Sequence, residues 1–323
     1  MSVVITGGAG FLGQRLAAEI LAQGHLALPD GTELLHPQII LADRPGAEVS
    51  PELAGKVTQR DLDITDADAT RDVLSDAQAV FHLAAVVSGQ AEAEFDLGYR
   101  VNLDGTRNVL EAARALGRRV PVVGTSSLAV FGVGAREPLT EASAAQPTNS
   151  YGASKAMAEL LMSDYRRKGF VEARVLRLPT IVVRPGAPNA AASSFASSIF
   201  REPLAGKPAR CPVDTGLPMW IASPDTAVAS MIQAMRVPMA DWPAFSAINV
   251  PGLTVTVAEM LEALQETGGI EARDLVTLDP DPAIEAIVAG WPARFDTSVT
   301  DALGFVSKEE TMGDILRAYL ADR

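Results

Sequence analysis

The sequence has one cysteine, three histidines and no long apolar run, so it has little of what disulfides, metal sites or membrane spans require. Its single cysteine, Cys211, excludes an internal disulfide and favours a reducing compartment. The histidines His25, His36 and His82 are scattered without the spacing of metal ligands, so no metal site is expected. No apolar run approaches about 18 residues, and no basic-then-apolar leader precedes the first expected strand. We therefore expect a cytoplasmic protein with no membrane partner.

Basic residues are also in deficit, with 27 Lys and Arg against 40 Asp and Glu, which gives a net charge of −13. This balance argues against nucleic acid or an anionic membrane surface as a partner. Hydrophobic residues at 48% and charged residues at 21% are the proportions of an ordinary globular protein. Because 323 residues are long for one core, we expect two domains.

A glycine-rich loop lies between an apolar strand at residues 2–6 and a helical run at 14–23. Its Gly-x-x-Gly-x-x-Gly spacing is typical of dinucleotide binding. The first glycine permits a tight turn, the second lets the backbone approach a pyrophosphate, and the third lets helix and strand pack closely. The helix N-terminus adds amide donors and a positive dipole end. The predicted contacts here are Gly7, Gly10, Phe11, Leu12 and Gly13.

The second expected strand, residues 38–42, ends at Asp43. A carboxylate at this place accepts from both ribose hydroxyls and repels a 2′-phosphate, which predicts NAD as the cofactor. Arg44 is the opposing signal, because an arginine can bind the 2′-phosphate of NADP. The distance from Gly13 to this strand is longer than usual, and we attribute the excess to an inserted hairpin or loop at residues 29–32.

Two more strands complete the predicted cofactor site. The strand at 57–60 leads to Asp61, which we expect to face the adenine amino group, although a shift of two residues would give this role to Asp63. The strand at 79–85 ends in small residues, where the cofactor crosses the backbone. The lone His82 within it is expected to be a satisfied core residue. The predicted contacts are Asp61, Leu62, Leu83, Ala84 and Ala85.

A long helix is expected from Tyr99 to Leu116, because apolar residues recur there at helical intervals. Asn102 is expected to tie this helix to the active-site strand or to reach the nicotinamide side of the cofactor. Together with the helix that starts at Tyr151, this helix offers a surface for a second copy of the chain, so we expect a homodimer.

Tyr151 and Lys155 are four residues apart on that helix, so both side chains can point into one pocket. A free phenol has a pKa near about 10, and an adjacent ammonium favours the phenolate. We therefore expect Lys155 to bring the pKa of Tyr151 towards neutrality, which makes Tyr151 a base for a substrate hydroxyl. Ser127, just after an expected strand at 120–124, can hydrogen-bond the same substrate oxygen. The alternative role of Ser126 and Ser127 is turn formation.

These motifs together resemble the extended short-chain dehydrogenase/reductase family, which includes sugar-nucleotide epimerases. The resemblance covers roughly residues 1 to 185 and is carried by residues 6–13, residues 82–85, Asn102, Ser126-Ser127 and Tyr151-x-x-x-Lys155. It implies an α/β Rossmann fold, a doubly wound parallel sheet with a smaller interleaved C-terminal α+β substrate lobe. It also implies that Tyr151 accepts the proton, that Lys155 binds the nicotinamide ribose and assists Tyr151, and that Ser127 orients the substrate. The implied cofactor contacts add Asn102, Tyr151, Lys155 and Leu178.

From this resemblance we expect an NAD-binding domain at residues 1–183, rejoined by about 223–250, and a substrate lobe at 184–222 and 251–323. Within the lobe, Thr256 and Glu259 have capping-box spacing for a helix that ends near Gly268.

Downstream, the sequence departs from the epimerases, which usually have an aromatic pair, an asparagine and a Tyr-Gly-Pro segment after the equivalent of residues 175–177. Residues 178–203 resemble instead a branch of the family that oxidises the 2-hydroxyl of a four-carbon sugar acid such as D-erythronate with NAD. A small-molecule sugar acid is therefore the expected substrate.

A sugar acid needs a residue that binds its carboxylate, and the Arg184 guanidinium offers a bidentate donor for it. The alternative role of Arg184 is an interdomain ion pair. The predicted substrate contacts are Ser88, Ser127, Tyr151, Thr180, Arg184 and Asn189, of which Asn189 is equally suited to a plain turn.

The main alternative is a nucleotide-diphosphate-sugar epimerase that uses the same three residues with tightly bound NAD. A 4,6-dehydratase is disfavoured, because residues 125–127 lack the acid pair that such enzymes use. A redox sensor that binds the dinucleotide without turnover is disfavoured too, because both Tyr151 and Lys155 are present. Trp291 is expected to be core packing rather than part of the pocket wall.

Overall fold

The computed structural model describes residues 1–132, 134, 137–186, 191–245 and 247–322. Its centre is a seven-stranded sheet in the order β12-β8-β7-β6-β1-β4-β5, in which every pairing is parallel. The strands are β1 (Ser2–Thr6), β4 (Gln38–Asp43), β5 (Thr58–Asp61), β6 (Ala77–His82), β7 (Pro121–Ser127), β8 (Glu172–Leu178) and β12 (Ala247–Asn249). The predicted fold class, a doubly wound parallel α/β sheet of Rossmann type, is confirmed.

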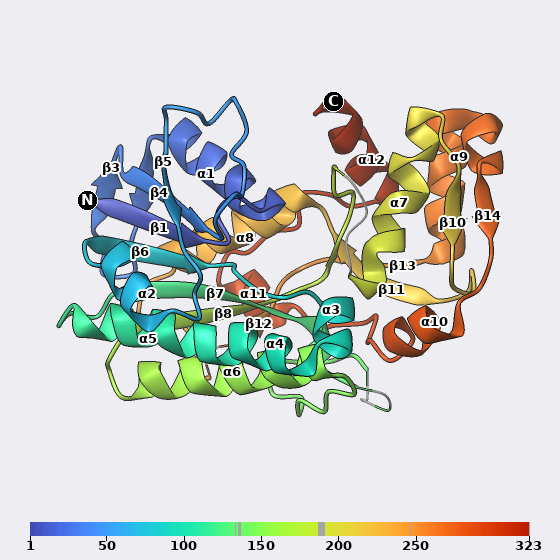
Figure 1. Ribbon diagram of the computed structural model, residues 1–323. Helices are drawn as coiled ribbons and strands as arrows, with labels where there is room; N and C mark the ends of the chain where they lie inside the picture. Colours follow the sequence, from blue (N-terminus) through green and yellow to red (C-terminus); the bar gives the residue numbers. More distant parts are fainter. Residues whose placement is uncertain (133, 135–136, 187–190, 246, 323) are drawn as a thin grey trace.

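Helices cover both faces of the sheet, because its central strands are apolar on both sides (Figure 1). One face packs against α1 (Phe11–Gln23) and α8 (Pro224–Arg236), which contribute Leu16, Ile20 and Met231 to one core cluster. The other face packs against α2 (Ala67–Val73), α5 (Thr106–Ala115) and α6 (Ser150–Arg167), which supply the second cluster. The sheet is therefore a buried layer, and its polar groups at the strand ends are left for a site.

Two segments refine the expected element boundaries. The excess length after Gly13 is a hairpin of β2 (His25–Ala27) and β3 (Glu33–Leu35), so the expected insertion is confirmed. The expected helix from Tyr99 is built from α4 (Phe95–Tyr99), a π-helical segment η1 (Arg100–Gly105) and α5. The sequence did not predict the wider π-helical segment, which contains Asn102.

His82, the last residue of β6, is a satisfied core residue, as expected. Its side chain is 5% exposed, and its two ring nitrogens lie 2.7 Å from the Thr6 hydroxyl and 3.0 Å from the Thr106 hydroxyl. Burial and the nearby charge of Lys155 lower the pKa of His82 to about 3. His82 is therefore neutral at physiological pH and links β1, β6 and α5.

A second set of elements packs beside the sheet around its own apolar core (Figure 1). Its strands are β9 (Thr180–Ile181), β11 (Pro218–Ala222) and β13 (Leu253–Thr256) in one small sheet, and β10 (Ala209–Cys211) with β14 (Val276–Leu278) in another. Its helices are α7 (Phe195–Arg201), α9 (Val257–Asp274), α10 (Pro282–Val288) and α12 (Met312–Ala321). Two further short α-helices are α3 (Ser88–Ala93) and α11 (Ser298–Ala302). Because α8 and β12 return to the main sheet between β11 and β13, the two parts interleave.

The capping box of α9 is present, with the Thr256 hydroxyl accepting from the Glu259 amide. The backbone leaves helical geometry at Gly269 (φ 79°, ψ 172°), one residue beyond the predicted helix end, and then continues helically to Asp274. None of the helices in the described part of the chain is long and apolar enough to cross a membrane. Across the same residues, no cluster of three or more His, Cys, Asp or Glu side chains is placed to bind a metal.

The carboxylate of Glu172, at the start of β8, forms ion pairs with several arginines. This carboxylate is 1% exposed and lies 3.0 Å from Arg166 Nε, 2.9 Å from Arg119 Nη2 and 3.5 Å from Arg174 Nη2. Burial lowers the pKa of Arg174 to about 10, and the charge of Glu172 acts to raise it. Removing such a carboxylate leaves buried positive charge without compensation.

We therefore expect Glu172→Gln to lower the free energy of unfolding by about 3 kcal/mol or more. Urea unfolding followed by circular dichroism measures this loss. Asp164→Asn serves as the control, because the Asp164–Arg167 pair is 57% and 70% exposed and such surface pairs contribute about 1 kcal/mol or less. Equal stability of the two variants would contradict the role given to Glu172.

Candidate active site

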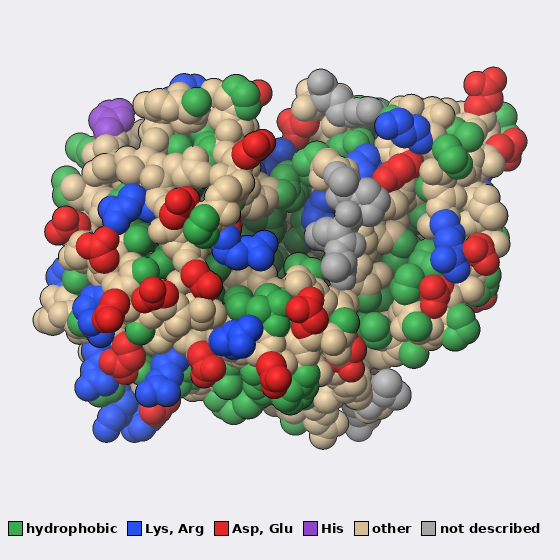
Figure 2. Space-filling model, viewed as in Figure 1, with side chains coloured by type: hydrophobic (Ala, Val, Ile, Leu, Met, Phe, Trp, Pro, Cys, Tyr) green, Lys and Arg blue, Asp and Glu red, His purple; other side chains and the backbone are tan. Residues whose placement is uncertain are grey.

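A cleft with a volume of about 350 Å³ opens at the carboxyl ends of β1, β6 and β7. Ligand sites of open α/β sheets are found at this edge of the strands. The glycine loop and α6 line one side, and the segment from Leu178 to Arg201 lines the other. Figure 2 shows the surface hollowed between the two parts of the molecule, with Lys and Arg side chains at the hollow.

The glycine loop forms a close-packed turn from β1 into α1. Gly7 has a φ of 68°, and a Cβ there would lie 2.6 Å from the backbone nitrogen of Ala84. A Cβ on Gly13 would lie 2.6 Å from the Gly7 carbonyl oxygen. These approaches leave the backbone bare at the N-terminus of α1, where Phe11 and Leu12 line the cleft with Gly7, Gly10 and Gly13. The loop therefore offers the cradle that a pyrophosphate needs.

Asp43 lies at the end of β4, beside an adjoining cavity of about 390 Å³. Its carboxylate accepts from the backbone amides of Ala9 at 3.0 Å and Arg44 at 2.8 Å. The Arg44 side chain lines the same cavity. The position of Asp43 suits a ribose, because its carboxylate is fixed next to the glycine loop.

Of the two aspartates considered for the adenine end, Asp63 lines this cavity and Asp61 does not. Both are exposed, and Leu62 and Ala84 line the cavity beside Asp63. Asp63 also accepts from the Thr65 amide at 2.9 Å, which fixes its side chain. Asp61 is the last residue of β5, whereas Asp63 lies two residues after the end of that strand.

Leu83 and Ala85 follow β6 and line the active-site cleft, but Asn102 does not. Asn102 is 1% exposed, and its side-chain amide is used within the protein. Its Oδ1 accepts from the Val86 amide at 2.8 Å, and its Nδ2 donates to the Val86 carbonyl at 3.1 Å and lies 3.3 Å from the Ser154 hydroxyl. Of the two roles expected for Asn102, the structure favours the tie between η1, the segment after β6, and α6.

Ser127, Tyr151 and Lys155 converge in the cleft. Ser127 is the last residue of β7, and Tyr151 lies in the first turn of α6, whose N-cap Asn149 accepts from the Gly152 amide at 2.8 Å. Ser127 hydrogen-bonds the Tyr151 side chain. Lys155 is 6% exposed; its Nζ donates to the Thr125 carbonyl at 2.9 Å and lies 5.9 Å from the centroid of the Tyr151 ring.

The expected lowering of the Tyr151 pKa by Lys155 is wrong for the protein alone. Burial raises the pKa of Tyr151 to about 12, while the hydrogen bond from Ser127 and the charge of Arg184 act to lower it. Burial also lowers the pKa of Lys155 to about 8, against the charge of Glu159, which raises it. The cation that favours the phenolate here is therefore Arg184, on the opposite wall.

That opposite wall carries the other predicted substrate contacts. Ser88, Thr180 and Arg184 all line the cleft, as does Leu178. The Ser88 hydroxyl accepts from the Ala192 amide at 3.2 Å, which ties α3 to this wall. Burial lowers the pKa of Arg184, and the nearby charge of Arg201 lowers it further. Asn189 lies outside the described residues.

Two residues that sequence reasoning did not assign to the site also line it. Arg201, the last residue of α7, donates through Nη1 to the Arg184 carbonyl at 2.8 Å. No motif marks it, because its place depends on how α7 packs. Trp291 packs against the apolar core of the second set of elements, as expected, and it also lines the cleft.

The charged side chains among the described residues lining the cleft are Lys155, Arg184 and Arg201, and all three are cations. A chain with a net charge of −13 therefore presents positive charge where a ligand would enter. Such a cleft attracts anions and raises their local concentration.

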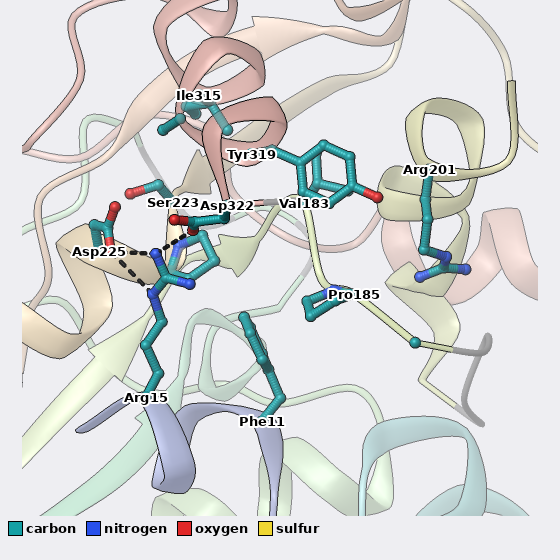
Figure 3. A pocket seen from close by; sticks show the side chains of 13 residues that line it. Phe11, Arg15, Val183, Pro185, Arg201, Ser223, Asp225, Ile315, Tyr319 and Asp322 are labelled. Carbon is teal, nitrogen blue, oxygen red and sulfur yellow. Dashed lines mark hydrogen bonds and ion pairs between the residues drawn. The ribbon is translucent and has the colours of Figure 1, made fainter. Parts of the chain in front are cut away.

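A second cavity of about 350 Å³ adjoins the cleft and shares Phe11, Pro185 and Arg201 with it (Figure 3). At its edge, Arg15 of α1 binds two carboxylates, Asp225 of α8 at 2.7 Å and Asp322 at the end of α12 at 2.5 Å. Helix α1 is thereby joined to α8 and to the end of the C-terminal helix.

The glycine loop, the fixed Asp43 and the convergence of a serine, a tyrosine and a lysine define a dinucleotide-dependent enzyme of the short-chain dehydrogenase/reductase type. Residues 3–230 match the NAD dependent epimerase/dehydratase family, and the chain belongs to that family.

Within the family, the chain is 46% identical to the D-erythronate dehydrogenase of Cupriavidus necator over 323 residues, which cover 100% of this chain and 98% of that protein. It is 43% identical to the D-erythronate dehydrogenase of Haemophilus influenzae over 94% of both chains. Among solved structures, a protein from Agrobacterium tumefaciens described as a nucleoside-diphosphate-sugar epimerase matches with a TM-score of 0.91 and 37% identity, over 100% of this chain and 94% of that one. The predictions of NAD as cofactor and of an NAD-dependent dehydrogenase are confirmed.

Proposed function

We propose that the protein oxidises the C2 hydroxyl of a small sugar acid, such as D-erythronate, to the 2-oxo acid with NAD. Two full-length relatives are named D-erythronate dehydrogenase, at 46% and 43% identity. The observation that carries the proposal for this chain is the set of cations in the cleft, Lys155, Arg184 and Arg201, which suits a carboxylate substrate.

The position of Arg184 supports oxidation next to the carboxylate. Arg184 is close enough to Tyr151 for their charges to interact across the cleft. A carboxylate bound by Arg184 therefore brings the adjacent carbon, C2, towards the Tyr151 hydroxyl. Thr180 on the same wall and Ser88 of α3, which also lines the cleft, would bind further hydroxyls of the substrate.

The residues present fit NAD. The bare backbone at Gly7, Gly10 and Gly13 leaves room for the pyrophosphate, and Asp43, fixed beside the glycine loop, would bind the adenosine ribose. Lys155 would bind the nicotinamide ribose. When bound, NAD supplies the acceptor for the hydride that leaves C2 and a positively charged nicotinamide ring.

The protein's own part in the reaction is to position the hydroxyl and move its proton. Ser127 donates to the substrate oxygen and holds it beside Tyr151. The Tyr151 phenolate takes the hydroxyl proton as C2 becomes a carbonyl carbon. The positive charge of Arg184 favours the phenolate over the phenol, which opposes the effect of burial.

We also propose which parts of the chain form the NAD-binding domain and which form the substrate lobe. Residues 1–183 with about 223–250 would bind NAD, and residues 184–222 with 251–323 would bind the acid.

We further propose a cytoplasmic homodimer that pairs through α5 and α6. Leu160 of α6 is 62% exposed and Phe95 of α4 is 57% exposed, which suits a covered surface.

A screen of NADH production across four- to six-carbon sugar acids, with UDP-sugars in parallel, tests the proposed reaction. We expect NADH with a four-carbon 2-hydroxy acid and identification of the 2-oxo acid by mass spectrometry. A 3-oxo product would contradict the assignment of C2. Interconversion of UDP-sugars without net NADH would show the alternative, the epimerase.

Arg184→Met tests the carboxylate anchor. Losing a charge-assisted hydrogen bond should raise the KM for the acid on the order of 10- to 100-fold. The KM for NAD should change little. Arg210→Met is the control, since Arg210 is 49% exposed and pairs with Asp279 away from the cleft. An unchanged KM for the acid in Arg184→Met would reject the anchor.

Tyr151→Phe should abolish turnover, with a loss on the order of 1,000-fold, because the proton acceptor is removed. NADH binding, measured by fluorescence titration, should stay nearly intact. Tyr165→Phe on the same helix is the control, because the Tyr165 hydroxyl donates to Glu111 outside the cleft. Loss of cofactor binding in Tyr151→Phe would mean that Tyr151 has a different role.

A further inference from the structure

The last three residues of β7 each bind a different residue of α6. The three pairs are Thr125 with Lys155, Ser126 with Glu159, and Ser127 with Tyr151. Because the α6 residues are spaced four apart, they lie on one face of the helix. We call these six residues the β7–α6 junction. Two of its pairs hold the proposed catalytic residues, and the pair of Ser126 with Glu159 has no role in the proposed reaction.

Glu159 is a buried carboxylate that is fixed from several sides. It is 2% exposed, and the Ser126 hydroxyl donates to its Oε1 at 2.5 Å. Arg177 of β8 donates to it through Nη2 at 2.7 Å and through Nε at 3.0 Å. The Arg177 guanidinium lies over the rings of Phe131 and Phe245, at 4.8 and 5.8 Å from their centroids. The carboxylate therefore has one position, one helical turn beyond Lys155.

The ionisable groups around the Lys155 ammonium come from three elements. On α6 it is flanked by Tyr151 and Glu159. Neutral His82 faces it from β6, and Arg177 of β8 lies behind Glu159. Among these groups Glu159 is the carboxylate.

We propose that Glu159, fixed by Arg177 and Ser126 one helical turn beyond Lys155, is a positioning residue that places a carboxylate beside the Lys155 ammonium and holds the end of β7 against α6. This inference rests on the proposed function, because it assigns Lys155 and Tyr151 their roles in the reaction. Glu159 does not touch the substrate; it acts through Lys155 and Ser126.

The sign of the effect follows from the surroundings of Lys155. Burial lowers the pKa of Lys155 to about 8, and the charge of Glu159 raises it. Without that charge the pKa falls further, so Lys155 loses its proton at a lower pH. An activity that needs the ammonium is then lost at a lower pH.

A purely structural role for the buried pair predicts something different. Glu172, at the opposite end of β8 from Arg177, is also a buried carboxylate paired with arginines, but it does not contact the β7–α6 junction. Glu172→Gln therefore removes a comparable ion pair and serves as the matched control. If Glu159 only stabilises the sheet, both variants should behave alike.

Glu159→Gln is tested first without substrate. Lys155 is titrated by its pH-dependent labelling with an amine-reactive reagent, read by mass spectrometry of the labelled peptide. We expect the midpoint to fall by about half a unit or more, with wild-type behaviour in Glu172→Gln. An unchanged midpoint would overturn the proposal. Because no substrate is used, this outcome does not depend on which acid the enzyme oxidises.

The pH profile of kcat/KM gives the second measurement. In Glu159→Gln the alkaline limb should move to lower pH, while the dissociation constant of NADH changes by about threefold or less. Glu159→Asp keeps the charge and should restore the limb. A profile that coincides with that of the wild type would overturn the proposal.

Arg177 would be left unpaired in Glu159→Gln, and that variant can fail to fold. The double variant Glu159→Gln with Arg177→Met removes both charges, so the Lys155 midpoint should still fall, but by less than in Glu159→Gln, because the Arg177 cation is removed as well. Ser126→Ala leaves the ion pair in place, so it should lower kcat several-fold without moving that midpoint. A wild-type kcat in Ser126→Ala would remove Ser126 from the proposal.

Discussion

The site depends on close contact between one strand end and one helix. The β7–α6 junction requires the N-terminus of α6 to lie directly against the turn after β7, and glycine makes this possible. A Cβ on Gly152 would lie 2.0 Å from the Ala129 carbonyl oxygen, and a Cβ on Gly124 would lie 2.8 Å from the sulfur of Met162. A larger side chain at Gly152 would meet backbone and force the helix outward, and the phenol would then leave its serine partner, whereas at Gly124 the Met162 side chain would have to move.

Burial and charge oppose each other in the cleft. Desolvation disfavours both the Tyr151 phenolate and the Lys155 ammonium, which are the forms that the proposed chemistry needs. The surrounding groups act in the other direction, with Arg184 favouring the phenolate and Glu159 favouring the ammonium. The same desolvation strengthens each of these interactions, since fewer water molecules screen them. The cleft is thus electrostatically prepared for an anion although the whole chain is acidic.

Much of the fold was predictable from short-range patterns. The glycine spacing, the apolar strands and Tyr151 with Lys155 belong to local segments, and the structure brings them to one edge of the sheet. What the sequence did not predict depends on packing between distant segments. Arg201 and Trp291 reach the cleft only through the fold of the second part of the chain, and the choice between Asp61 and Asp63 depends on where β5 ends. The pKa of Tyr151 was misjudged because spacing alone does not reveal how far a phenol is desolvated.

Arg15 joins parts of the molecule that lie on either side of the second cavity. It binds Asp225 beside the main sheet and Asp322 at the end of the C-terminal helix, and the three side chains are 28%, 41% and 49% exposed. Ion pairs with this much access to water weaken as ionic strength rises. Dissolved salt therefore acts on the connection between the two halves and leaves the deeply buried groups around Tyr151 largely unaffected. Any step in which the halves separate to exchange the dinucleotide acquires a sensitivity to salt that the chemical step lacks.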